Sequence, residues 1–173
     1  MKLAFRPAEV DERRCLCPGD PRDSEQCSLV VSTWSSSYKK SYSAGAIWTE
    51  DWAGIWHKQA TRHLARPNAV TLLAYEAEDP SFVYGWIAGD MSEPTPIVFY
   101  VYVKESFRRS GIASRLFAAL GVDPHRPFTY ACQTPVVFVD MDIRIKLPRA
   151  RWNPNELRYP KESRRGRWQT PRP

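Results

Sequence analysis

The chain has 173 residues, of which 43% are hydrophobic and 13% aromatic, which is enough material for one hydrophobic core. No apolar run approaches the ~20 residues of a membrane span, and the first six residues lack the long apolar stretch of a signal peptide, so we expect a cytoplasmic protein. The net charge is +6, but residues 144 to 173 alone contribute +8 and leave −2 for residues 1 to 143.

The first part of the chain predicts one strand and two helices. Residues 2 to 7 form a short strand candidate, and a loop rich in Pro, Asp and Gly follows. Residues 27 to 39 have apolar side chains at helical spacing, and residues 49 to 65 do so more clearly, with Pro67 as a stop signal. We expect the aromatic stripe of the second helix to lie in the core.

Three strands are predicted next, at residues 69 to 77, 81 to 88 and 97 to 103. Short connections between them favour an antiparallel meander. The third strand is an unbroken run of β-branched and aromatic residues, which is typical of a strand buried on both faces.

A turn and a helix follow this third strand. Apolar residues recur at helical spacing from Gly111 to Leu120, and Gly121 stands where a helix would stop. The free N–H groups of a helix N-terminus attract anionic oxygens, and Arg108 and Arg109 add positive charge. Because Gly111 has no Cβ, a phosphate could approach the backbone closely. The sequence therefore predicts a phosphate-binding turn.

The pattern Arg108-x-x-Gly111-x-Ala113 resembles the Q/R-x-x-G-x-G/A motif of the GNAT N-acetyltransferase superfamily. The order of predicted elements over residues 2 to 132, β-α-α-β-β-β-α-β, is also that of the superfamily. The resemblance implies an α/β (α+β) fold with a mixed, mostly antiparallel central sheet flanked by helices.

The resemblance also implies acetyl-CoA as co-substrate and an amine as acceptor. In the superfamily the strand end binds the pantetheine arm, and the following turn and helix N-terminus bind the pyrophosphate. The residues of this chain at those positions are Val101, Tyr102, Val103, Arg108, Arg109, Ser110, Gly111, Ile112, Ala113 and Ser114.

The chain departs from the superfamily after a last predicted strand at residues 128 to 132. A helix bearing a general-acid Tyr is expected there, but residues 137 to 147 alternate apolar and polar side chains, which favours a strand. The usual acid therefore cannot be carried over. Asp90, at a strand end, is our candidate base, and Tyr130 is our candidate proton donor, with Tyr100 and Tyr102 as rivals for either role.

Cysteines stand at positions 15, 17, 27 and 132. In a cytoplasmic chain we expect them to be reduced. The spacing Cys15-x-Cys17 is not that of a zinc knuckle, and no nearby His completes a tetrahedral site, so no metal is predicted.

Two regions are predicted: residues 1 to 150 as an acyl-CoA-binding domain and residues 151 to 173 as a basic tail. Residues 161 to 173 are rich in Arg and Pro with one Trp, which suits contact with nucleic acid or, alternatively, a solvated tail.

The sequence thus predicts an acetyl-CoA-dependent N-acetyltransferase whose acceptor is a small molecule, a protein or a nucleic acid. Two alternatives stay open. One is a non-catalytic CoA-fold protein that acts through its basic tail, and the other is a relative of the Mom-like proteins, which modify bases of nucleic acid.

Overall fold

The computed structural model describes residues 2–8, 25–39, 52–92, 94–123, 125–131 and 150–152. The chain order of its elements is β1 (Leu3–Pro7), α1 (Glu25–Lys39), α2 (Trp52–Leu64), β2 (Ala69–Glu76), β3 (Asp79–Asp90), β4 (Ile97–Val103), the short 3-10 helix η2 (Glu105–Phe107), α3 (Ile112–Leu120), β5 (Phe128–Tyr130) and β6 (Ala150–Trp152). This order confirms the fold class predicted from the sequence.

The six strands form one sheet in the order β1-β2-β3-β4-β5-β6. Strands β1 to β4 pair antiparallel with their neighbours, as the predicted meander requires. Strand β5 then pairs parallel with β4, and β6 pairs parallel with β5. The sheet is therefore mixed: its first four strands are antiparallel and its last two are parallel to β4.

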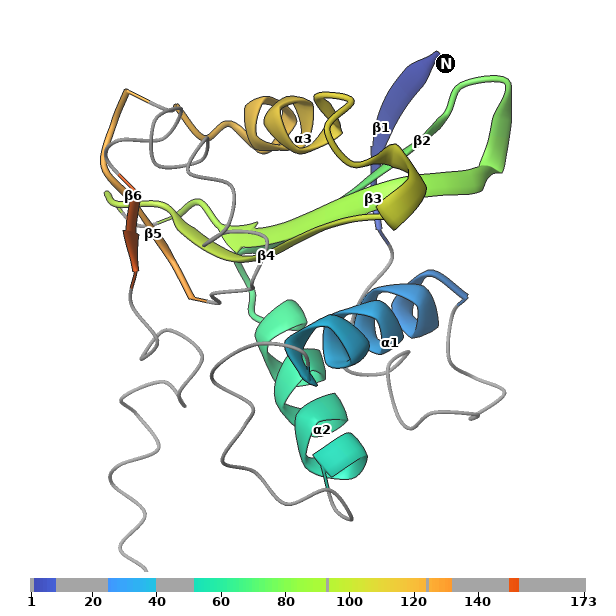
Figure 1. Ribbon diagram of the computed structural model, residues 1–173. Coiled ribbons are helices and arrows are strands. Elements are labelled where there is room, and N and C mark those ends of the chain that lie inside the picture. The colour runs from blue at the N-terminus through green and yellow to red at the C-terminus, as the bar shows by residue number, and fades with distance from the viewer. Residues whose placement is uncertain are drawn as a thin grey trace, which may run out of the picture.

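Helices cover both faces of this sheet (Figure 1): α3 lies on one face, and α1 and α2 lie on the other. On the α3 face the buried stripe Ile112, Leu116 and Leu120 packs with Ile87 and Phe128. These helix positions recur every four residues, so they share one side of α3. The helix ends at Gly121, whose left-handed φ of 86° lets its N–H donate to the carbonyls of Ala118 and Phe117.

The face under α1 and α2 is dominated by aromatic rings. Trp34 of α1 lies edge-on to Trp56 of α2, with ring centroids 5.8 Å apart, and stacks on Tyr100 of β4 at 5.5 Å. Trp86 of β3 joins this group and donates its indole N–H to the Thr33 hydroxyl at 2.9 Å. The aromatic side chains of these elements therefore form the core on this face, as the sequence predicted for α2.

Several expectations need adjustment. Strand β3 is longer than predicted and reaches Asp90. Cys27 is disulfide-bonded, so the expectation of reduced cysteines is wrong for this residue; the other three cysteines lie outside the described residues. Arg151 and Trp152, assigned to the basic tail, pair with β5 and extend the sheet into that range.

Two further predictions fall on parts of the chain that the structure does not describe. These are the strand over residues 137 to 147 and the basic segment over residues 161 to 173. Within the described ranges, no helix combines the length and apolar character needed to cross a bilayer.

Candidate functional site

Strand β4 has two neighbours at one end and one at the other. Along its whole length it pairs with β3, from Ile97 opposite Asp90 to Val103 opposite Gly85. Its pairing with β5 covers only Ile97 and Val98. Among the described residues, the half of β4 that ends at Val103 therefore has an open edge on the side away from β3.

A β-bulge separates these two halves. Val98 is opposite Gly89 and Tyr100 is opposite Ala88, so Phe99 is an extra residue without a partner on β3. The side chains agree with this change of register, because Phe99 and Tyr100, although consecutive, both pack on the face of α1 and α2. In a regular strand consecutive side chains point to opposite faces, so a residue is inserted here.

The bulge reverses the direction of the main-chain groups beyond it. Before the bulge, the Val98 carbonyl accepts from Ala131 N–H, next to β5, at 3.0 Å; beyond it, Lys104 N–H donates to the Tyr84 carbonyl on β3 at 2.8 Å. The main-chain groups of alternate residues in a strand point to the same side. Because Lys104 points to β3, Val101 and Val103 point their N–H and C=O groups toward the open edge. The Val103 carbonyl is indeed used there, by the Arg108 Nε–H at 3.3 Å.

The turn after β4 has an unusual backbone. Arg109 has a φ of 65° and Gly111 a φ of 81°, and a left-handed conformation is uncommon for a residue other than glycine. Ser110 Oγ donates to the Phe107 carbonyl at 2.5 Å. This turn leads directly into α3, whose N-cap residue is Gly111.

The N-terminus of α3 is uncapped. Its N-cap residue, Gly111, has no side chain to cap the first N–H groups, and no acidic residue lies in its first turn. A Cβ added to Gly111 would meet no atom within 4 Å, so the backbone there borders open space. The free N–H groups and the positive end of the helix dipole can therefore receive an anionic oxygen.

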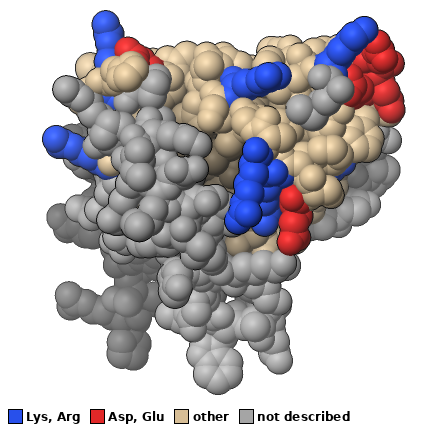
Figure 2. Space-filling view, turned by 45° about the horizontal axis from the view of Figure 1, so that its top comes forward, with Lys and Arg blue, Asp and Glu red and all other residues tan. Residues whose placement is uncertain are grey.

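The side chains around this N-terminus are basic and exposed. Arg108, Arg109 and Arg115 are all exposed, and Lys104 lies just before the turn with its ammonium 4.7 Å from the Phe82 ring centroid. In Figure 2 the Lys and Arg side chains of the described residues stand at several separate places on the face in view rather than as one continuous patch. The exposed arginines beside the helix N-terminus therefore add positive charge at a place where an anion can bind.

The predicted cofactor-binding residues are brought together by this arrangement. Val101 to Val103 form the open edge, and Arg108 to Ser114 form the turn and the first turn of α3. Tyr102, however, directs its ring to the other face, where it stacks over Trp86 at 6.3 Å. Its side chain is therefore part of the sheet packing.

The two candidate catalytic residues lie at the closed end of β4. Asp90 is opposite Ile97, and its Oδ1 accepts from the N–H of Ser92 at 3.0 Å and from its hydroxyl at 2.6 Å. Tyr130 is opposite Val98 and half-buried among the residues under α3. Val101 lies four positions after Ile97, at most about 13 Å along a strand.

The rival Tyr100 is buried against Trp34 and Trp86. Reasoning from the sequence missed the bulge at Phe99. It also missed two contacts of Phe99: the His63 ring of α2 lies 5.6 Å from the Phe99 ring centroid, and the guanidinium of Arg66, just after α2, lies 5.0 Å from it. Both faces of β4 are apolar, so the sequence contains no alternation that a bulge could visibly interrupt.

A scan against protein-family models and a search of curated protein sequences both find no match. A search of solved structures does find chains with a similar fold. A putative acetyltransferase of the GNAT family from Desulfovibrio desulfuricans is 19% identical, with a TM-score of 0.40, and the match covers 68% of this chain and 62% of that one, less than two thirds of its length.

Two further structures are similar. A putative GNAT family acetyltransferase from Staphylococcus aureus is 16% identical, with a TM-score of 0.46 over 67% of this chain and 86% of that one. The PaiA N-acetyltransferase from Thermoplasma acidophilum, solved in complex with coenzyme A, is 14% identical, with a TM-score of 0.42 over 70% of each chain. The chain is similar to GNAT-family acetyltransferases.

Proposed function

We propose that the protein is an acetyl-CoA-dependent N-acetyltransferase, which moves an acetyl group from the thioester to an amine of its acceptor. The observation that supports this most directly is the juxtaposition of two features in one short segment. The open edge of β4 ends at Val103, and the uncapped N-terminus of α3 begins at Gly111. Among the described residues, the first offers main-chain groups that no other strand pairs with, and the second offers an anion site.

The residues present fit the chemistry of acetyl-CoA. Its pantetheine arm contains amides, which can extend the sheet by bonding to the outward N–H and C=O groups of Val101 and Val103. Its pyrophosphate is anionic, and the first N–H groups of α3 together with Arg108 and Arg109 would hold it. The open space at Gly111 leaves room for that group.

In the reaction the amine nitrogen attacks the thioester carbonyl carbon, a C–N bond forms and the C–S bond breaks. Negative charge develops on the carbonyl oxygen, and a backbone N–H fixed at the β4 edge would stabilise it. A proton leaves the amine and another reaches the sulfur. The candidates that the sequence offers for these transfers, Asp90 as base and Tyr130 as acid, stay predictions, and Oδ1 of Asp90 already accepts two hydrogen bonds from Ser92.

Calorimetry with acetyl-CoA tests the cofactor. The wild-type chain should bind it, and Gly111→Asn should weaken binding at least tenfold, because Asn tolerates a left-handed backbone but fills the open space. Gly121→Asn is the matched control, since Gly121 also has a positive φ and open space, at the opposite end of α3. If the wild type shows no affinity for acetyl-CoA, the proposed function is wrong.

The basic segment over residues 161 to 173 stays a prediction, as does the cytoplasmic location. If the segment binds nucleic acid, affinity should fall steeply with salt and should be lost on deletion of the segment. Binding that is insensitive to salt would reject that role.

A further inference from the structure

Tyr84 of β3 lies beside the anion-binding turn and contacts it in two ways. Its main-chain carbonyl accepts the N–H of Lys104 at 2.8 Å, which fixes the first residue after β4. Its ring lies edge-on to the ring of Phe107 in η2, with centroids 4.8 Å apart. One residue therefore holds both the beginning and the middle of the turn.

The apolar anchor of the turn is Phe107. Between Lys104 and Gly111 the one apolar side chain is Phe107, and its ring contacts the rings of Tyr84 and Phe82. Phe82 is 39% exposed, whereas Tyr84 is buried. Since exposed aromatic rings lose part of their packing to water, Tyr84 provides the firmer of the two supports.

The orientation of Tyr84 is itself determined by its neighbours. Gly85 is opposite Ala74 and Val83 is opposite Tyr75, so Tyr84 is the extra residue of a bulge in β3. Its hydroxyl donates a short hydrogen bond to Oε2 of Glu76 on β2. A carboxylate acceptor strengthens such a bond, so the ring is held from both its backbone and its hydroxyl.

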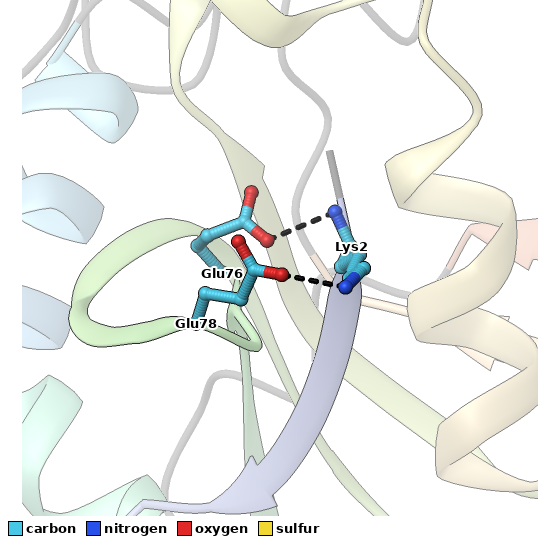
Figure 3. Close-up of polar contacts among 3 residues, drawn as sticks. All are labelled: Lys2, Glu76 and Glu78. Carbon is cyan, nitrogen blue, oxygen red and sulfur yellow. Dashed lines mark hydrogen bonds and ion pairs between the residues drawn. The ribbon is translucent and has the colours of Figure 1, made fainter.

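Glu76 is in turn held by the N-terminal segment (Figure 3). Its other oxygen, Oε1, accepts the main-chain N–H of Lys2 at 2.9 Å, and the Lys2 ammonium lies 2.5 Å from Glu78. A continuous series of contacts thus runs from Lys2 through Glu76 and Tyr84 to Phe107. It joins an edge of the sheet to the turn.

We propose that Tyr84 is a positioning residue for the cofactor-binding turn, which it holds in place through Phe107 and Lys104 without touching the ligand. This inference rests on the proposed function for its effect on acetyl-CoA. It also has a consequence in the free protein, because the turn should open more often when the Tyr84 ring is absent.

Hydrogen exchange of the free protein tests the second consequence. In Tyr84→Leu the amides of residues 107 to 111 should exchange at least tenfold faster than in the wild type. Tyr75→Leu is the matched control, because Tyr75 is a half-buried tyrosine that packs against the cluster on the opposite face. Its loss should lower the melting temperature without changing exchange in the turn.

Kinetics and binding test the first consequence. For Tyr84→Leu the KM and Kd of acetyl-CoA should rise at least tenfold, while kcat at saturation and the KM of the acceptor stay within twofold. Tyr84→Phe keeps the ring and removes the hydrogen bond to Glu76, so the KM and Kd of acetyl-CoA should rise only a few-fold. This variant also tests the proposal if Tyr84→Leu does not fold.

The outcomes separate the two proposals. A wild type that does not bind acetyl-CoA rejects the proposed function, but faster exchange in the turn of the Tyr84 variants still supports the positioning role. If exchange in residues 107 to 111 is the same in the Tyr84 variants as in the wild type, or rises equally in Tyr75→Leu, the positioning role is rejected.

Discussion

The two halves of β4 are built from the same kind of residue but have different surroundings. Ile97 and Val98 are held between β3 and β5, and their main-chain groups serve the sheet. Beyond the bulge at Phe99, Val101 and Val103 keep β3 as a neighbour but turn their remaining groups to an open edge. A strand can therefore supply stability at one end and binding groups at the other.

The difference arises from one inserted residue. Without Phe99 the alternation would continue unbroken, and the outward groups would belong to Tyr100 and Tyr102, whose rings lie against Trp86. With it, the outward groups belong to Val101 and Val103, whose side chains pack under α3. The bulge thus places the open amides on residues that immediately precede the anion-binding turn.

The largest expected effect comes from removing an outward N–H. Proline is tolerated where the missing N–H faces away from a ladder, so Val101→Pro should fold, yet kcat/KM for acetyl-CoA should fall a hundredfold or more, as for loss of an oxyanion donor. Val101→Ala keeps the N–H and is the matched control, with activity near that of the wild type. Equal activity of the two variants would show that the Val101 N–H has no role.

The second prediction compares a glycine opposite each half. A Cβ on Gly89 would lie 2.6 Å from the Ile97 carbonyl oxygen, and one on Gly85 would lie 2.3 Å from that of Tyr102. At the closed half β4 cannot move away, because β5 lies behind it, so Gly89→Ala should lower the free energy of unfolding by about 3 kcal/mol, as overpacking does.

At the open half β4 can move away from the added Cβ. Gly85→Ala should therefore affect binding of acetyl-CoA more than stability. Its stability loss should be about 1 kcal/mol, below that of Gly89→Ala, but the KM of acetyl-CoA should rise about tenfold because the binding edge has shifted. Denaturant unfolding and steady-state kinetics measure the two quantities. Equal stability losses with an unchanged KM would contradict the distinction between the halves.

Much of this arrangement could be predicted from residue pattern. The β-branched and aromatic run gave β4 its correct limits, and the glycines at 111 and 121 marked both ends of α3. The bulge could not be predicted, because apolar residues on both faces hide a change of alternation. The short β6, three residues long, depends on pairing with β5, which no local pattern reveals.

The surroundings of Asp90 could be predicted only in part. It ends a strand, as expected, and its Oδ1 closes a turn on Ser92. The spacing Asp90-Met-Ser92 is typical of such a turn and could have indicated it. The left-handed backbone of Arg109 had no comparable signal, since that conformation is favoured by glycine and, less strongly, by asparagine, aspartate and histidine, but not by arginine.

A third prediction concerns acid stability near the open half. The hydrogen bond from Tyr84 holds the pKa of Glu76 below its ordinary 4.5, with the Lys2 N–H adding to the effect. A lowered folded-state pKa means that this stabilisation is present above pH 4.5 and is lost as the pH falls through the folded-state pKa. Glu76→Gln should therefore flatten the fall of melting temperature below pH 4.5.

Glu78→Gln is the control for that experiment, because Glu78 forms an exposed ion pair with Lys2, and such pairs contribute little. At the alkaline end the same bond raises the pKa of Tyr84 to about 12. That part of the stabilisation is present below pH 10 and is lost as the pH rises through 12. An acid limb in Glu76→Gln as steep as in the wild type would contradict the assignment.

The smallest expected effect isolates the backbone of the turn at the end of the open half. Arg109 adopts a φ of 65°, which costs a residue with a Cβ about 1 kcal/mol. Arg109→Ala and Arg109→Gly both remove the guanidinium, but only glycine relieves this strain. The two variants should therefore bind acetyl-CoA equally weakly. The glycine variant should be the more stable one, by less than about 1 kcal/mol in the free energy of unfolding. The difference is small because glycine also raises the entropy of the unfolded chain, which offsets part of the relieved strain. If alanine proves as stable as glycine and binds as the wild type does, neither the strain nor the charge at this position serves the anion site.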